Sequence, residues 1–273
     1  MTRPARPTLS FGIGAAVGYA GGLIGLGGAE FRLPALVGVL RFSARDAVAV
    51  NLVASLVVLA AAFPFRAATV PLPDIAPHIP AILGMLAGSM SAAWVGAGWL
   101  RQVSDRVLGR LILILLVVLG FVLIIEGVFV AAPSRLISDD PLVTFVVAAA
   151  CGVGVGLVSS LLGVAGGELI IPIFILIFGA DVKLAGSMSV LVSIPTILVG
   201  LSRHFGPDSV LRTAHVWRTT LVPLCAGSVL GAILGALALG VFPSQTLKIG
   251  LGIILIVSAW GVFRHLPQSS PAK

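Results

Sequence analysis

The sequence predicts an all-α, polytopic membrane protein made of two homologous halves. The chain has 273 residues, of which 58% are hydrophobic and 10% are charged, whereas about 25% are charged in a soluble domain. Mean hydropathy is +1.15, and apolar runs long enough to cross a bilayer recur along the whole chain. Because these runs are continuous rather than alternating, the spans are expected to be helices and not strands of a barrel.

The first half, residues 1–135, is expected to hold one overlong apolar element and about three simple spans. The element at 10–40 exceeds the ~20 residues that one span needs, and glycines and a proline interrupt it. A polar gap at 41–46 comes after this element, and a proline-rich connection at 69–80 comes after the first simple span. The simple spans are expected at 47–63, 81–100 and 111–131, with a charged turn before the last.

The second half, residues 136–273, repeats this plan. Its overlong element at 142–178 is again broken by glycines. The spans after it are expected at 184–201, 218–241 and 247–263, and the polar tail is expected to be disordered. The basic N-terminus resembles the start of a signal peptide, but the apolar run continues into the glycine cluster, so we expect the segment to be retained.

The two overlong elements share a motif. GYAGGLIGLGGAEFRLP at 18–34 and GLVSSLLGVAGGELIIP at 156–172 carry glycines, a glutamate and a proline in the same order. AGS also occurs within the third segment of each half, at 87–89 and 226–228, and each copy lies in a ladder of small residues that favours close helix packing in lipid. Duplicated units with broken helices are typical of secondary transporters.

The loop charges predict how these elements cross the membrane. If both overlong elements enter and leave on the same side as re-entrant elements, the outer side keeps few basic residues, as the positive-inside rule requires. The cytoplasmic side then holds Arg3, Arg6, Arg41, Arg45, Arg101, Arg106, Arg110, Arg203, Arg212, Arg218, Arg264 and Lys273, and the outer side holds Arg66, Arg135, Lys183 and Lys248. Each half then has three full crossings, so the halves are expected to be inverted relative to one another.

The glycine-rich breaks are the candidate substrate site. Glycine permits sharp turns and close approach of the backbone, and proline opposes a continuous helix. Helix starts exposed at a break attract anions, which favours a small-anion site there over glycines that only permit packing. The candidate residues in the motifs are Gly25, Gly27, Gly28, Glu30, Arg32, Pro34, Gly163, Gly166, Gly167, Glu168 and Pro172.

Glu30 and Glu168 leave two interpretations open. A carboxylate within the membrane is costly and marks function, and burial disfavours its ionised form, so either glutamate could exchange a proton during transport. Alternatively, both stabilise the starts of short helices. Arg32, present only in the first copy, is a candidate partner of Glu30 or of the substrate. Asn51 and Ser187 are candidate neutral hydrogen-bond donors to an oxyanion, with Ser55, Ser189 and Ser193 as weaker ones.

Several function classes find no support in the sequence. It has no GxxxxGK[ST] loop, no HExxH motif and no metal-ligand spacing among its histidines, so we predict neither an enzyme nor a bound cofactor or metal. The net charge of +7 lies in short loops, which indicates membrane topology rather than nucleic-acid binding. Cys151 and Cys225 lie in apolar segments and are interpreted as packing residues.

The paired motifs GLGGAEFRLP and GVAGGELIIP, followed by AVAVN and LAGSM, resemble the TauE/SafE (sulfite exporter) family of membrane permeases. The resemblance covers essentially the whole chain, although Ala29 replaces the usual third glycine in the first copy. It implies a multi-pass protein of a prokaryotic inner membrane that transports sulfite, organosulfonates or related anions.

The sequence therefore predicts a secondary permease for small sulfur-containing oxyanions. Its expected partners are an anionic substrate, the lipid bilayer and protons or other coupled ions, and a homo-oligomer is compatible with the sequence. The alternatives are a cation or proton conductor, which the two glutamates would suit, and a non-catalytic membrane subunit of a larger complex.

Overall fold

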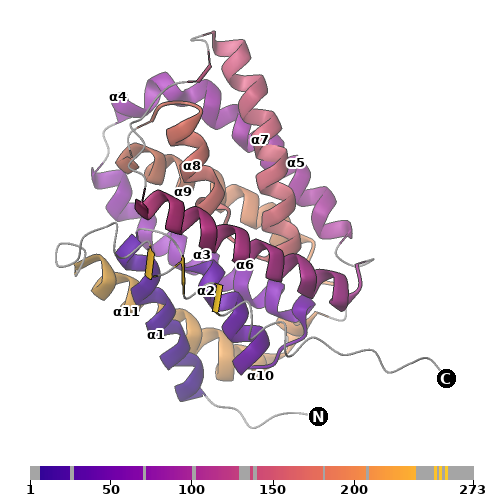
Figure 1. Cartoon of the computed structure of the whole chain (residues 1–273). Helices are drawn as coiled ribbons and strands as arrows, with labels where there is room; N and C mark the ends of the chain where they lie inside the picture. Colours follow the sequence, from indigo (N-terminus) through magenta and orange to yellow (C-terminus); the bar gives the residue numbers. More distant parts are fainter. Residues whose placement is uncertain are drawn as a thin grey trace.

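The computed structural model describes most of the chain as helices packed into one body (Figure 1). The described residues are 7–24, 28–69, 72–99, 103–128, 136–137, 140–180, 182–206 and 209–237, with short helical pieces at 249–250, 252–253 and 256–257. No β-strand occurs among these residues. The prediction of an all-α protein is confirmed.

The first half contains α1 (Pro7–Ile24), α2 (Ala29–Pro34), the π-helical segment η1 (Ala35–Val39), α3 (Ala44–Thr69), α4 (Leu72–Ile75), η2 (Ala76–His78), α5 (Ile79–Trp99) and α6 (Asp105–Val128). The second half contains α7 (Pro141–Leu162), α8 (Gly167–Leu176), α9 (Val182–Ser202), η3 (Val210–Arg212), α10 (Ala214–Val216), η4 (Trp217–Leu221) and α11 (Val222–Leu237).

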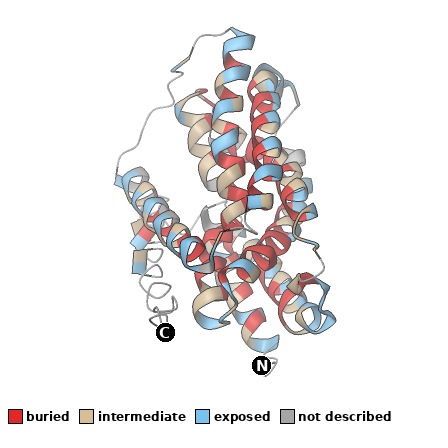
Figure 2. Ribbon diagram, turned by 90° about the vertical axis from the view of Figure 1, so that its right-hand side faces the viewer, coloured by how far each residue is buried: buried red, intermediate tan, exposed pale blue. Residues whose placement is uncertain are grey.

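Five of the described helices are long and apolar enough to cross a membrane. They cover Ala44–Pro64, Pro73–Trp99, Pro141–Leu162, Leu184–Ser202 and Ala214–Gly235. Figure 2 shows that the buried residues face the interior, while the outer faces are exposed. Many of the exposed side chains are large and apolar, including Ile114, Val118, Phe121 and Ile125 on α6. Such surfaces are expected where helices contact lipid rather than water.

Several helices extend beyond the predicted membrane spans. The proline-rich connection at 69–80 contains helical turns, and α5 starts at Ile79. The charged residues Asp105, Arg106 and Arg110 lie in the first turns of α6 rather than in a turn before it. Helix also begins at Ala214, ahead of the predicted span at 218–241. Hydropathy marks only the apolar part of each helix, whereas the helices themselves extend beyond it into polar sequence.

The prolines do not make the breaks. Pro34 is the last residue of α2, and the chain continues in helical geometry through η1. Pro172 lies inside α8. The prediction that these prolines interrupt the overlong elements is wrong, because helical geometry is lost before them, at the glycine-rich stretches. After Pro34 the helix widens to a π-helical turn, in which Leu40 N–H donates to Ala35 O.

The two halves are intertwined through two helix pairs. α1 packs along α11, and α5 packs along α7, so each pair takes one helix from each half (Figure 1). On α1 and α11, Phe11 lies opposite Gly227 and Ala15 lies opposite Gly231. Because the partners advance together along both helices, the two run parallel. The same pattern holds for α5 and α7, where Met85 lies opposite Gly152.

Equivalent glycines make equivalent contacts in the two pairs. A Cβ atom on Gly18 would overlap the carbonyl oxygen of Ser228, and a Cβ atom on Gly156 would overlap the carbonyl oxygen of Ser89. Gly18 and Gly156 occupy matching places in the repeated motif, as do Ser89 and Ser228 in the repeated AGS. The small-residue ladders therefore pack helices, as predicted, and they pack them across the halves.

Replacing one of these glycines should separate the paired helices. Gly156→Ala should lower the free energy of unfolding by about 1–3 kcal/mol, because the methyl group would overlap the backbone of α5. Gly154→Ala is the matched control, since a Cβ atom there has nothing within 4 Å. Thermal unfolding of the detergent-purified variants measures the difference. Equal effects of the two substitutions would contradict the packing described here.

Candidate functional site

The two breaks have the same backbone geometry at matching glycines. Gly28 has φ 68° and immediately precedes α2, and Gly166 has φ 82° and immediately precedes α8. Gly163, which follows α7, also has φ 68°. Residues other than glycine rarely adopt this left-handed conformation. The repeated glycines therefore set the direction in which each short helix leaves its break.

After each break the chain lies back beside the helix that preceded it. A Cβ atom on Gly28 would lie 2.9 Å from the carbonyl oxygen of Val17 and 3.6 Å from the Cα atom of Gly21. A Cβ atom on Gly166 would lie 3.0 Å from the Cγ1 atom of Val155. Val17 and Val155 are matching positions of the repeat, so both breaks return the chain to the same point on the preceding helix.

Arg32 lies on α2, four residues after Gly28 of the first break. Its side chain is 0% exposed. The guanidinium Nε donates to Asn51 Oδ1 at 3.0 Å, Nη2 donates to Ser55 Oγ at 2.8 Å and Nη1 donates to Ser228 Oγ at 3.4 Å. These acceptors belong to α3 and α11, so both halves hold the guanidinium. These three acceptors are neutral groups.

Asn51 joins the two breaks. Its Nδ2 donates to the carbonyl oxygen of Ala29, at the start of α2, and to that of Gly163, at the end of α7, both at 2.8 Å. Its Oδ1 accepts from Arg32. Since the amide nitrogen carries two hydrogens, both donors are used in this structure. The predicted role of Asn51 as a donor to an oxyanion remains a prediction, but the structure gives these donors a different use.

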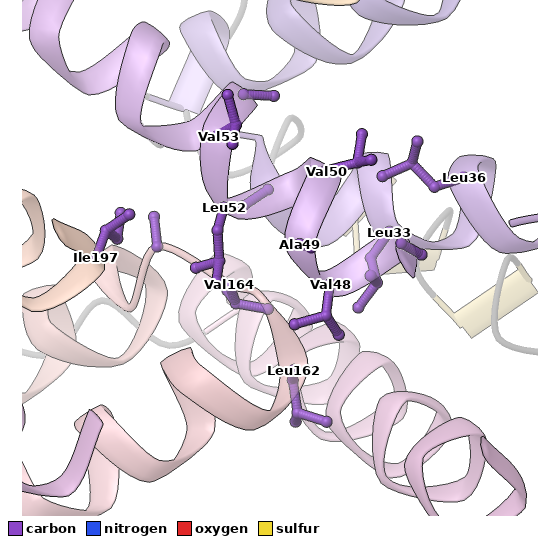
Figure 3. Packing of buried hydrophobic residues seen from close by; sticks show 14 of the residues in the cluster. Leu33, Leu36, Val48, Ala49, Val50, Leu52, Val53, Leu162, Val164 and Ile197 are labelled. Atoms are coloured by element: carbon purple, nitrogen blue, oxygen red, sulfur yellow. The ribbon is translucent and has the colours of Figure 1, made fainter. Parts of the chain in front are cut away.

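The backbone of α3 comes close enough for this connection because of Gly163. A Cβ atom there would lie 2.7 Å from the Cα atom of Val48, one turn before Asn51 on α3. Figure 3 shows Leu162 and Val164, the neighbours of Gly163, beside Val48 and Leu52. All four side chains are buried in one apolar cluster. Apolar packing thus fixes the distance across which the Asn51 amide reaches.

The structure describes the two motif glutamates to different extents. Glu30, at the second position of α2, is 1% exposed. The side chain of Glu168 lies outside the described residues, although its backbone is part of α8.

The other predicted residues divide into three groups. Gly25 and Gly27 lie outside the described residues. Gly167 begins α8, with the Ser189 hydroxyl 3.8 Å from the position of a Cβ atom there. Ser187 is buried on α9.

Sequence reasoning missed Ser228, because a serine in the repeated AGS indicates only helix packing. Among the described residues, no three His, Cys, Asp or Glu side chains are placed to hold a metal ion.

A side chain at a left-handed glycine should lower the stability of the protein. Gly28→Ala should cost roughly 1–2 kcal/mol of stability from the positive φ alone, with the close approach of Val17 in addition. Gly38→Ala is the control in the same element, because a Cβ atom there has nothing within 4 Å. Chemical or thermal unfolding of both variants tests this, and a Gly28→Ala protein as stable as the control would refute it.

Comparison with protein families gives one match that covers nearly the whole chain. The family model described as "Sulfite exporter TauE/SafE" matches residues 1–123 and 147–273. Comparison with curated proteins and with solved structures gave no match. The match takes in both breaks, the buried Arg32 network and the two intertwined helix pairs. The chain belongs to the sulfite exporter TauE/SafE family, a family of membrane transporters of sulfur-containing anions.

Proposed function

We propose that the protein is a secondary transporter of small sulfur-containing oxyanions, such as sulfite or an organosulfonate, and that Arg32 binds the anion. The observation that carries this proposal is the complete burial of the Arg32 side chain beside the first glycine break, where α3 and α11 supply its hydrogen-bond acceptors. A buried cation is costly, and within a membrane such a residue marks the path of a substrate or an ion.

The surroundings of Arg32 suit an exchangeable anion. Ser55 and Ser228 stabilise the guanidinium through hydroxyl groups, which are weaker acceptors than a charged oxygen. An oxyanion that enters the break would replace one or both hydroxyls, because two of its oxygens match the planar fork of the guanidinium. Since hydroxyls accept from Arg32 when the anion is absent, the charge is never left without hydrogen bonds during a cycle.

The geometry of the breaks supports re-entrant elements. Residues 28 and 166 each lie beside the preceding helix, near a valine about two turns before its end, as expected when a chain turns back within the membrane. Together with the distribution of loop charges, this supports two re-entrant elements in inverted halves. The corresponding proposal for location is the inner membrane of a prokaryote, with the N-terminus in the cytoplasm.

Glu30 carries the alternative function. A buried carboxyl group suits a cation or proton pathway, and Glu30 is almost fully buried. The neighbouring Arg32 opposes a cation at the same site, so we place anion transport first. If transport of the anion is coupled to protons, Glu30 and Glu168 are the proposed carriers. Otherwise their charge serves only to stabilise the helix starts.

Transport by purified protein in liposomes tests the role of Arg32. Arg32→Gln should lower the apparent affinity for sulfite by about 10- to 100-fold, because charge-assisted hydrogen bonds contribute about 1.5–3 kcal/mol. Arg32→Lys should retain part of the activity, since it keeps the charge but not the planar fork. Arg45→Gln is the control, because Arg45 is exposed on α3 and donates to Val103 O.

Only folded protein is compared, as judged by size-exclusion chromatography in detergent. Unchanged sulfite uptake in Arg32→Gln would refute anion binding at this residue. Movement of a cation, with no movement of sulfite, sulfoacetate, taurine or thiosulfate, would favour the alternative function.

Cysteine labelling tests the re-entrant topology. With Cys151 and Cys225 replaced by serine, single cysteines in the segment 179–183 should react with a membrane-impermeant reagent added outside intact cells. The side of the N-terminus is fixed independently with a fused reporter. Labelling of 179–183 only from the side of the N-terminus would rule out the re-entrant arrangement of the second half.

A further inference from the structure

We propose that Asn51 is a positioning residue that couples the two breaks, so that a change at one is transmitted to the other. The inference goes beyond the anion site itself and rests on the proposed transport function only for its role in the transport cycle. Its basis is one buried carboxamide that donates to Ala29 and Gly163 and accepts from Arg32.

The two carbonyl groups that Asn51 binds lie in different halves, each at the end of a helix beside a break. Gly163 caps the C-terminus of α7, where the last carbonyl groups have no helical partner and need another donor. Ala29 begins α2, directly after the first break. Asn51 is 0% exposed, so water cannot replace it on either carbonyl group without entering the core. One side chain therefore satisfies a polar group at both breaks.

The third hydrogen bond connects this coupling to the proposed substrate site. Asn51 Oδ1 accepts from Nε of Arg32, so the orientation of the carboxamide is fixed by the guanidinium. A displacement of Arg32, such as an arriving anion would cause, moves the acceptor and with it the two N–H donors. Through Asn51, a movement of Arg32 therefore reaches the second break. The acceptor there, the carbonyl oxygen of Gly163, is 112 residues from Asn51 in sequence.

Two substitutions separate the contact with Arg32 from the contacts with the breaks. Asn51→Asp keeps the shape and an acceptor for Arg32, but it removes both N–H donors and sets a carboxylate against two carbonyl oxygens. Ser55→Ala lies one turn further along α3, is equally buried, and removes an acceptor of Arg32 without touching either break. Asn51→Ser, whose side chain is too short to reach both carbonyl groups, substitutes for Asn51→Asp if that variant does not fold.

Hydrogen–deuterium exchange of the whole protein, without substrate, measures the coupling. Backbone exchange should rise by about tenfold in segments 28–33 and 163–170 of Asn51→Asp, because buried carbonyl groups at both breaks lose their donors. In Ser55→Ala, which keeps both N–H donors of Asn51, exchange in segment 163–170 should rise much less than in Asn51→Asp. An unchanged rate for 163–170 in Asn51→Asp, or an equal rise in Ser55→Ala, would overturn the proposal.

A second measurement tests transmission rather than local loosening. Gly28→Ala strains only the first break, and it should also raise exchange in segment 163–170. When Asn51→Asp is already present, adding Gly28→Ala should leave exchange in segment 163–170 unchanged. A remote effect of equal size in both backgrounds would overturn the coupling role. Neither measurement uses an anion, so the proposal can fail or hold independently of sulfite transport.

Discussion

The fold depends on keeping one guanidinium charge inside an apolar bundle. Arg32 is fully buried, and the groups that accept its hydrogen bonds come from α3 and α11. A buried charge is costly unless its N–H groups are hydrogen-bonded. Acceptors must therefore come from the helices that surround Arg32. This requirement accounts for several features at once: the short helix that presents Arg32, the polar residues on otherwise apolar helices, and the close approach of α11 from the other half.

Close approach is made possible by residues without side chains. α1 meets α11, and α5 meets α7, through glycines that bring backbone against backbone. These contacts build each helix pair from both halves, so the two sequence repeats are not the units that pack. Ser228 illustrates how the contacts serve the site, because its carbonyl oxygen lies against Gly18 while its hydroxyl accepts from Arg32.

Much of this arrangement could be predicted from the sequence. Hydropathy predicts the helical membrane class, and the repeat predicts two broken elements with matching glycines. Those signals are local, because span length, glycine and charge act within a few residues. The same local reasoning gives Pro34 and Pro172 a part in the breaks beside the glycines, yet both prolines lie within helical segments. Whether a proline breaks a helix depends on how the turn before it can adjust, and local sequence does not show this.

The contacts of Asn51 and Ser228 could not be predicted in this way. The acceptor Gly163 is 112 residues from Asn51, and Ser228 is 196 residues from Arg32. Nothing in the local sequence distinguishes a serine that packs a helix from one that also accepts a hydrogen bond across the bundle. Such pairings depend on how the halves intertwine, and this is decided by packing in three dimensions.

The central claim is that a small oxyanion binds at Arg32. Selenite has the shape and charge of sulfite and scatters anomalously, so diffraction from crystals grown with selenite would locate the anion directly. The account predicts an anomalous peak within hydrogen-bonding distance of the Arg32 guanidinium, where the Ser55 and Ser228 hydroxyls lie in the absence of anion. A peak elsewhere in the bundle, with Arg32 still bound to both hydroxyls, would contradict it.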